Sequence, residues 1–390
     1  MTTKTQNQVS RVAVLVGTST QWGRQLVSGI QSYARMHGPW FTFIEPRAVE
    51  EPMSLPKGWD GDGVIARIST NRMARELQAL KCPVVNVSGI TLSGPEFPSV
   101  TTDHRISGQM AAEYFRERGY KQVAYFSLTG LPFVRVQQNA FAVAARHAGM
   151  AYSLFAVRPQ HGTEPDWNLN LNTLGTWLQS LPKPVAILAW NTSSSRELLY
   201  AAHVNGIRVP EDMAVLCGTD DDFFCTSSFI PLSGIRVPAE QTGLNAAALL
   251  DRLMQGQKLP RNKILLEPLG IITRQSTDTI AIDDPALAKA LCFIRENGDR
   301  NIRVTDVVRS AGISRRILEV KFKNFLTRSP ADEIRRMHIE RAKHLLEHTD
   351  HPIPVVADRS GFGSPEHFVY MFNRAVKLTP LKYRKHIRCR

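Results

Sequence analysis

Cysteine is scarce in this chain, which has five in 390 residues. None of them forms a C-x-x-C pair, so neither a structural zinc site nor a disulfide framework is expected, and we expect no cofactor. Scattered single thiols are typical of a reducing compartment. The five are Cys82, Cys217, Cys225, Cys292 and Cys389.

Long apolar segments are also missing. Runs such as residues 12–16 are far shorter than the roughly 20 residues that a membrane-spanning helix needs. The first ten residues are polar, so we expect a disordered segment at 1–10 and no secretory signal. These observations predict a cytoplasmic protein without a membrane partner.

Acidic residues are depleted at one end only. The net charge is +13, and residues 285–390 hold 22 basic and 11 acidic residues, whereas the remainder holds 26 and 24. A basic segment on a nearly neutral body indicates a polyanionic partner, with double-stranded DNA as the first candidate. The alternative is a basic face that serves solubility alone.

Strand-like and helix-like segments alternate through residues 11–275. This pattern predicts two doubly wound α/β subdomains, with crossovers between them near residues 120, 230 and 260. In such sheets ligands bind beyond the carboxyl ends of the strands, here in the cleft of a bilobed domain. The polar residues 276–285 are the expected linker.

Residues 286–390 are helical in pattern, and we expect an all-α domain with two helix-turn-helix units at 304–325 and 354–377. Gly312 is suited to end the first helix of its unit, while Ser314 and Ser364 are suited to cap the second helices. Such pairs present one helix to a major groove.

The helical domain resembles the AraC/XylS family of transcription regulators. The resemblance implies binding to specific DNA sequences, contact with RNA polymerase and a homodimer. Thr327 and Lys377 stand where the family usually has glycine, and His338 stands where arginine is commoner. The matching residues are Gly312, Leu318, Phe322, Pro330, Ala342, Ala357, Gly361, Phe362, Phe368, Phe372, Pro380 and Tyr383.

DNA-contacting side chains are expected on or beside the second helix of each unit, where early positions reach base edges and outlying basic groups reach phosphates. In the first unit these are Ser314, Arg315, Arg316, Lys321 and Lys323. In the second they are Ser364, Glu366, His367, Tyr370, Asn373 and Arg374.

One motif points elsewhere. Residues 344–348 read H-x-x-E-H, which in a helix places His344 and His348 on one face, as in a class of zinc proteases. Leu345 and Leu346 within the motif are needed as core residues of the connecting helix, so we favour the structural interpretation.

The larger domain resembles the LacI/GalR-type ligand-binding domain, itself similar to periplasmic sugar-binding proteins. The resemblance rests on residues 100–103, Gly108, Gly119, residues 206–212 and 218–221. Thr192 and Gln137 stand where the family usually has charged residues. The candidate ligand-binding residues are Trp22, Arg24, Arg135, Trp190, Asn191 and Asp220, because sugars need aromatic faces and polar groups.

A LacI-like sensor followed by an AraC-type reader is similar to activators of pentose operons. The combination implies an activator of sugar catabolism genes, with a pentose effector and D-xylose as the first candidate. An enzyme on the same doubly wound fold is the alternative, although no Gly-rich phosphate loop follows a strand. We expect no enzymatic activity.

Overall fold

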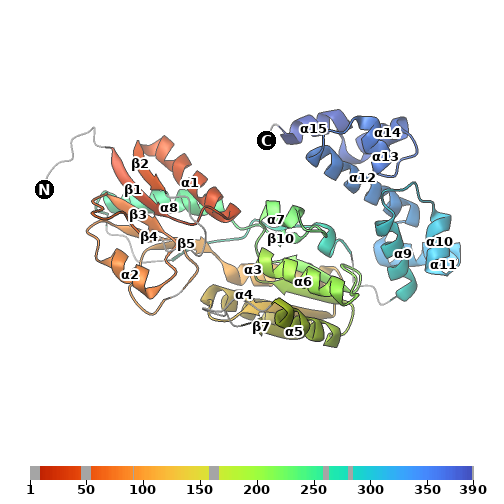
Figure 1. Cartoon of the computed structure of the whole chain (residues 1–390), viewed down its shortest axis with the longest axis horizontal. Helices are drawn as coiled ribbons and strands as arrows, with labels where there is room; N and C mark the ends of the chain where they lie inside the picture. The colour runs from red at the N-terminus through yellow and green to blue at the C-terminus, as the bar shows by residue number, and fades with distance from the viewer. Residues whose placement is uncertain are drawn as a thin grey trace. The chain divides into compact units, whose positions relative to one another are not determined.

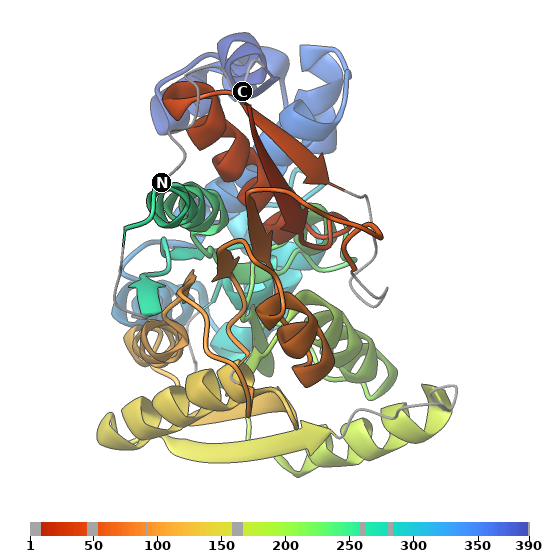
Figure 2. The ribbon, with the colours of Figure 1, turned by 90° about the vertical axis from the view of Figure 1, so that its left-hand side faces the viewer.

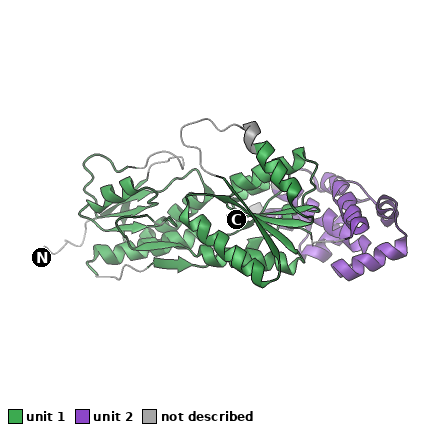
Figure 3. Ribbon diagram, turned by 90° about the horizontal axis from the view of Figure 1, so that it is seen from below, with its two compact units in different colours: residues 1–279 green, residues 280–390 purple. Residues whose placement is uncertain are grey.

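The computed structural model describes residues 9–44, 54–90, 92–157, 167–257, 263–279 and 284–388. The chain forms two compact units, unit 1 at residues 1–279 and unit 2 at 280–390 (Figure 3). The expected linker at 276–285 spans this division. The described residues do not include residues 1–8 of the expected N-terminal disordered segment, residues 280–283 or Cys389. No helix in the described ranges is both long and apolar enough to span a membrane.

The first lobe of unit 1 is built on a six-stranded sheet of order β11-β5-β4-β3-β1-β2, in which all neighbouring strands are parallel (Figure 1). The central strands are apolar along their length because both faces of the sheet are covered by helices. All four residues of β3 are buried, for example. The elements are β1 (Ser10–Leu15), α1 (Gln21–His37), β2 (Trp40–Ile44), β3 (Gly63–Ala66), α2 (Asn71–Gln78), β4 (Val84–Asn86), β5 (Ser99–Thr102), α8 (Ala239–Met254) and β11 (Lys263–Leu266).

The second lobe has a sheet of order β12-β10-β9-β8-β6-β7, in which only the β10–β12 pair is antiparallel among the described strands. Strands β8 and β9 are entirely buried. The elements are α3 (His104–Glu117), β6 (Gln122–Leu128), α4 (Pro132–His147), β7 (Ala151–Val157), α5 (Trp167–Ser180), β8 (Val185–Ala189), α6 (Thr192–Val204), β9 (Met213–Cys217), α7 (Asp222–Thr226), β10 (Ser233–Ile235), β12 (Ile271–Ile272) and a 3₁₀ turn (Gln275–Thr277).

The chain passes between the lobes three times, between β5 and α3, between β10 and α8, and between β11 and β12. The first passage lies at residue 103, earlier than the sequence indicates, because α3 packs against α4 of the second lobe. Gly108 of α3 makes this packing close, since a Cβ there would lie 2.3 Å from the Gln137 carbonyl oxygen. The other two passages lie at residues 236–238 and 267–270.

Unit 2 is entirely helical in its described residues, and two helix pairs each have their own core. The long helix α12 serves both, because Ile334 packs in the first core and Leu346 in the second. The helices are α9 (Pro285–Glu296), α10 (Val304–Ala311), α11 (Arg315–Leu326), α12 (Pro330–His348), α13 (Ile353–Arg359), α14 (Pro365–Val376) and α15 (Pro380–Arg388), seen from a second direction in Figure 2 in colours from cyan to blue.

His338 of α12 lies where the two helix pairs of unit 2 meet. A Cβ on Gly361, in the turn of the second pair, would lie 2.6 Å from His338 Nε2 and 2.6 Å from the Arg300 carbonyl oxygen, which precedes the first pair. Position 361 therefore requires glycine for two reasons. A Cβ would clash with these two atoms, and the backbone φ of +78° is strained for other residues. An imidazole at this position fills the narrow space that the two pairs leave.

Thr327 and Lys377 end the second helices of the two pairs, and both adopt left-handed backbone conformations, with φ of 58° and 62°. The two positions where the family usually has glycine are therefore positions where this chain holds a non-glycine residue in a strained backbone conformation. A left-handed conformation costs a residue with a Cβ about 1–2 kcal/mol.

Thr327→Gly is expected to raise the free energy of unfolding by about 1 kcal/mol, because glycine adopts this conformation without steric cost. Thr327→Ala, which keeps a Cβ, is the matched control and should give no comparable gain. Urea unfolding of the full chain measures both variants. Equal unfolding midpoints would show that the backbone at Thr327 is not strained.

Candidate effector site and DNA-reading surface

The carboxyl ends of the two sheets meet where α1 begins. The Gln21 backbone N–H, after β1, donates to Asp221 Oδ2 at 3.1 Å, and the Asp222 backbone N–H, after β9, donates to Gln21 Oε1 at 2.5 Å. These two hydrogen bonds join the first lobe to the second. We call the region where the carboxyl ends meet the lobe junction.

A second contact across the junction involves Gly89, which follows β4. A Cβ there would lie 3.1 Å from His104 Nε2 and 3.1 Å from Phe133 Cβ, and both of these residues belong to the second lobe. Burial lowers the pKa of His104 to about 4, with Lys263 contributing in the same direction and Asp103 opposing. His104 is therefore neutral near pH 7.

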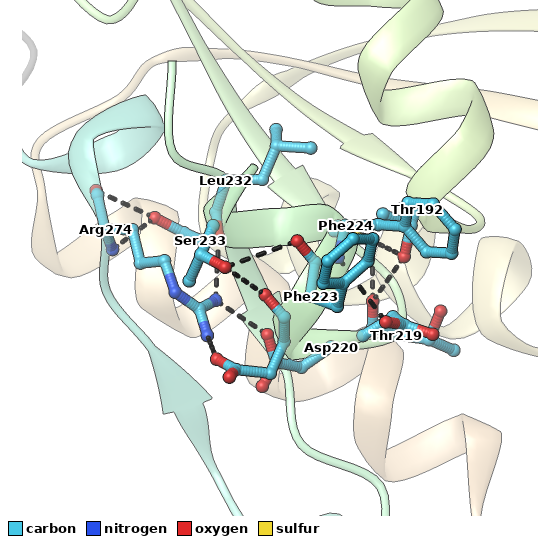
Figure 4. A network of polar contacts seen from close by, with 12 residues as sticks. Thr192, Thr219, Asp220, Phe223, Phe224, Leu232, Ser233 and Arg274 are labelled. Atoms are coloured by element: carbon cyan, nitrogen blue, oxygen red, sulfur yellow. Dashed lines mark hydrogen bonds and ion pairs between the residues drawn. The ribbon is translucent and has the colours of Figure 1, made fainter. Parts of the chain in front are cut away.

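Asp220, the expected ligand-binding carboxylate after β9, forms an ion pair with Arg274. Figure 4 shows the Arg274 guanidinium between Asp220 and the Leu232 carbonyl oxygen, at 2.6 and 2.8 Å, and its other nitrogen lies 2.8 Å from Asp222 Oδ1. The side chains of Asp220 and Arg274 are only 6% and 11% exposed. Burial lowers the pKa of Arg274, but the hydrogen bond and charge of Asp220 outweigh it and raise the pKa overall.

Backbone contacts of Arg274 hold this pair in place. Its N–H donates to Ser233 Oγ at 2.8 Å, and Ser233 Oγ donates to its carbonyl oxygen at 2.9 Å (Figure 4). The arginine thus enters the site from the segment after β12, the strand that follows the third passage between the lobes. The negative charge of Asp220 is compensated within the protein.

Three further expected ligand residues have the following surroundings. Asn191 caps α6, and its Oδ1 accepts from the Ser194 N–H at 2.8 Å. Arg24 is exposed and donates to the carbonyl oxygens of Thr18 and Ser19 at 3.0 and 2.9 Å. Arg135 is exposed on α4.

The two expected aromatic residues follow strands β1 and β8 and are half-buried. Trp190 directly follows β8, and Trp22 lies in the first turn of α1, beside the Gln21 contact. The guanidinium carbon of Arg67 lies 5.9 Å from the centre of the Trp22 ring system. Tryptophan faces attract cations at this distance.

Thr192 and Gln137, which replace the charged residues usual in the family, are turned into the second lobe. Gln137 is 4% exposed and its Oε1 accepts from the Tyr125 hydroxyl at 2.7 Å. Thr192 Oγ1 donates to the Thr219 carbonyl oxygen at 3.2 Å (Figure 4). Both polar groups therefore bond within the lobe.

The sequence reasoning missed three polar residues of this region: Gln21, Arg67 and Arg274. Gln21 and Arg67 follow strands β1 and β3, at the edge where ligands bind in doubly wound sheets. Their positions after these strands could therefore have marked them as candidate ligand-binding residues. Arg274 is 54 residues from Asp220, and no local pattern relates the two.

In unit 2, the exposed face of α11 carries basic and apolar residues. Arg316, Val320 and Lys323 are exposed at spacings of four and three, which places them on one stripe, opposite the buried Leu318 and Phe322. Ser314 caps the helix, as expected, because its side chain accepts from the Ile317 N–H.

The other two basic candidates on α11 have partners within the protein. Lys321 forms an ion pair with Asp284, the cap of α9. Arg315 Nε lies 2.9 Å from Glu319 Oε1. For the other two candidates, Arg316 and Lys323 on the outer stripe, no ion-pair partner is found within the described ranges.

Helix α14 repeats the geometry of α11 with different chemistry. Both helices have 12 residues and a serine cap, and the Ser364 side chain accepts from the His367 N–H at 3.2 Å. Glu366, Tyr370 and Asn373 are exposed at the spacing of the α11 stripe, and Tyr370 is 62% exposed. His367 and Arg374 are exposed beside them. The outer face of α14 is aromatic and polar, whereas that of α11 is basic.

The H-x-x-E-H motif lies on α12, where Leu346 is fully buried in the second core and Leu345 packs against it. Within the described ranges, no group of three or more His, Cys, Asp or Glu residues is placed to hold a metal ion.

Three family models match the chain. They are the XylR N-terminal domain at residues 11–105, a periplasmic binding protein-like domain at 112–277 and a helix-turn-helix domain at 307–386. The expected fold class, a bilobed periplasmic-binding-protein-like domain followed by a double helix-turn-helix domain, is confirmed.

Full-length relatives agree with these matches. The chain is 29% identical over 384 residues to the xylose operon regulatory protein of Escherichia coli (strain K12), covering 96% of each chain. It is 28% identical to the protein of that name from Haemophilus influenzae, covering 97% of this chain and 98% of that one. A solved structure of the xylose-binding transcription activator xylR superposes with a TM-score of 0.80 at 28% identity, over 97% and 98% of the two chains.

Arg274→Met is expected to lower the free energy of unfolding by about 3–5 kcal/mol, because it leaves the buried Asp220 carboxylate without a cation. Asp222→Asn is the matched control: it removes the other carboxylate of the same guanidinium, but Asp222 is 64% exposed, so about 1 kcal/mol or less is expected. Chemical unfolding measures both. Equal losses would contradict the assignment of Asp220 as the buried partner.

Proposed function

We propose that this chain, which belongs to the AraC-type helix-turn-helix transcription regulators and carries a periplasmic-binding-protein-like sensor, activates sugar catabolism genes when a pentose binds between its lobes. The observation that carries the proposal is the pair of 12-residue helices of unit 2, each capped by serine and each with an exposed polar stripe. Two such helices in one chain suit two successive segments of a DNA major groove.

D-xylose is the first candidate effector, because relatives that match this chain over nearly its whole length are named xylose operon regulatory proteins. Trp22 and Trp190 supply aromatic surfaces for the carbon–hydrogen side of a sugar ring. The remaining candidates for contacts with hydroxyl groups are Arg24, Arg135, Asn191 and Asp220, the last two through atoms not used in capping or ion pairing.

Ligand binding would act by favouring one arrangement of the lobes. A ligand shifts such an equilibrium only by its higher affinity for one state. Gln21 bonds to the Asp221 side chain and to the Asp222 backbone N–H. These two hydrogen bonds exist only when the lobes lie close together. The effector and these contacts therefore stabilise the same state.

The two reading helices contribute differently to DNA binding. On α11, Arg316 donates to a guanine edge, and Lys323 neutralises phosphate. On α14, Asn373 suits adenine, and the carboxylate of Glu366 accepts from a cytosine amino group, since phosphates repel it. The hydroxyls of Ser314 and Ser364 and the exposed His367, Tyr370 and Arg374 complete the proposed contact surface.

The protein would act as a homodimer in the cytoplasm, where its DNA site and RNA polymerase are found. Two-fold symmetry doubles the number of reading helices, and a bound activator raises transcription by contacting the polymerase. The alternative of a sugar-metabolising enzyme has no observation in its favour in the described residues.

Lys323→Ala should weaken binding to all duplexes about equally and reduce the slope of log affinity against log salt by about 1, because it removes one phosphate contact. Arg316→Ala should cost about 1–3 kcal/mol and relax specificity at one base pair. Lys289→Ala is the control, since Lys289 is an exposed lysine of α9, outside both reading helices.

Fluorescence anisotropy with duplexes from the promoter of a xylose catabolism operon, with and without D-xylose, measures these effects. If the wild-type chain showed no preference for promoter over random duplex in either condition, the regulator proposal would fail. A salt slope that Lys289→Ala reduces as much as Lys323→Ala would overturn the assignment of the α11 stripe.

A further inference from the structure

Arg67 is a cation in unit 1 without a compensating charge among the described residues. It is only partly exposed, and burial lowers the pKa of its guanidinium. No hydrogen bond or ion pair to that guanidinium is found within the described part of the chain. Its guanidinium carbon lies 5.9 Å from the centre of the Trp22 ring. Arginines are rarely buried unless paired, so this position needs an explanation.

Other half-buried arginines show the usual solution. Arg274 is bound by Asp220 and Asp222, and Arg336 of α12 is bound by Glu333 at 2.8 Å. In both cases carboxylates compensate for the loss of hydration of the guanidinium. The guanidinium donors of Arg67, by contrast, have no hydrogen-bond partner among the described residues.

The location of Arg67 links it to the lobe junction. It directly follows β3, whose parallel neighbour β1 leads to α1, and the backbone N–H of Arg67 donates to the Leu15 carbonyl oxygen at 2.9 Å. Trp22, beside its guanidinium, is the next residue after Gln21, which makes the hydrogen bonds to the second lobe. Arg67 therefore lies at the carboxyl edge of the sheet, where ligands of this fold bind.

Apart from Arg135, which is exposed on α4, the expected polar ligand-binding residues of the second lobe already have partners. Asp220 is neutralised by Arg274, and the Asn191 side-chain oxygen caps α6. Gln137 and Thr192, at positions where the family usually has charged residues, bond within the lobe. Among the described charged groups at the lobe junction, Arg67 of the first lobe is then the half-buried donor that remains for a ligand.

We propose that Arg67 is an effector-binding residue, whose guanidinium donates hydrogen bonds to acceptor oxygens of a polyhydroxylated five-carbon ligand at the lobe junction. This proposal rests on the effector site described under Proposed function and assigns to it a residue of the first lobe. A guanidinium has five N–H donors and no acceptor, so the ligand must offer oxygen lone pairs. Hydroxyl and ring oxygens of a neutral pentose and the carboxylate of its aldonic acid share this chemistry.

Isothermal titration calorimetry of the full chain with D-xylose and with D-xylonate tests the proposal. Arg67→Met should weaken binding of the compound that binds by about 10- to 100-fold, the loss expected for a hydrogen bond from a charged group. Arg67→Lys should bind with intermediate affinity, because it keeps the charge but loses the fork of donors. A preference for D-xylonate identifies a carboxylate partner, and a preference for D-xylose identifies hydroxyl or ring oxygens.

Arg72→Met is the matched control, because Arg72 lies on α2 of the same lobe with a side chain that is 85% exposed. Its ligand affinity should equal that of the wild type. Thermal unfolding without ligand separates binding from structure: Arg67→Met should leave the midpoint unchanged or raise it, since it removes an uncompensated buried cation. A structural role for Arg67 would lower the midpoint.

Unchanged ligand affinity in Arg67→Met overturns the inference, and so does a lowered midpoint without ligand. Failure of the wild type to bind either compound overturns the ligand class. Promoter binding measured on the same variants keeps the two proposals apart. A wild type that binds promoter DNA, with an Arg67→Met variant that binds ligand normally, refutes only the role of Arg67, whereas a wild type that binds no promoter DNA refutes the regulator proposal.

Discussion

The sensor part of this molecule depends on the common direction of the parallel strands in its two sheets. Parallel strands all end at the same edge, so the segments after β1, β3, β8 and β9 deliver their side chains to one region of each lobe. The contact of Gln21 with Asp221 and Asp222 joins these two edges. Residues 200 or more positions apart in sequence thereby become parts of one site.

Charge is distributed unequally across the lobe junction. In the second lobe, the Asp220 carboxylate is matched by Arg274 from the segment after β12. In the first lobe, Arg67 has no carboxylate partner in the described residues. Buried ionic groups cost free energy unless they are paired. The pair in the second lobe thus belongs to the folded scaffold, and the solitary cation in the first is available for an interaction outside it.

In unit 2, the two reading helices are alike on their buried side and differ on their exposed side. Helices α11 and α14 share their length, their serine caps and their left-handed final residues, while buried Leu318 and Phe368 occupy the equivalent inner position. Their outer stripes differ, because one is basic and the other contains Glu366 and Tyr370. Since α12 contributes to the cores of both pairs, the two dissimilar surfaces are carried on one connected framework.

The sequence by itself determined the fold class and the local form of the helix-turn-helix units. Strand and helix patterns, Ser314 and Ser364 as caps, and Gly312 in a left-handed turn all depend on neighbours within a few residues, and the structure has each of them. Only the tertiary structure decided which polar groups are free. Asp220 meets Arg274, Lys321 meets Asp284, and Arg67 meets no carboxylate in the part of the chain that the structure describes. Ion pairs form between residues that the fold, and not the spacing along the chain, brings together.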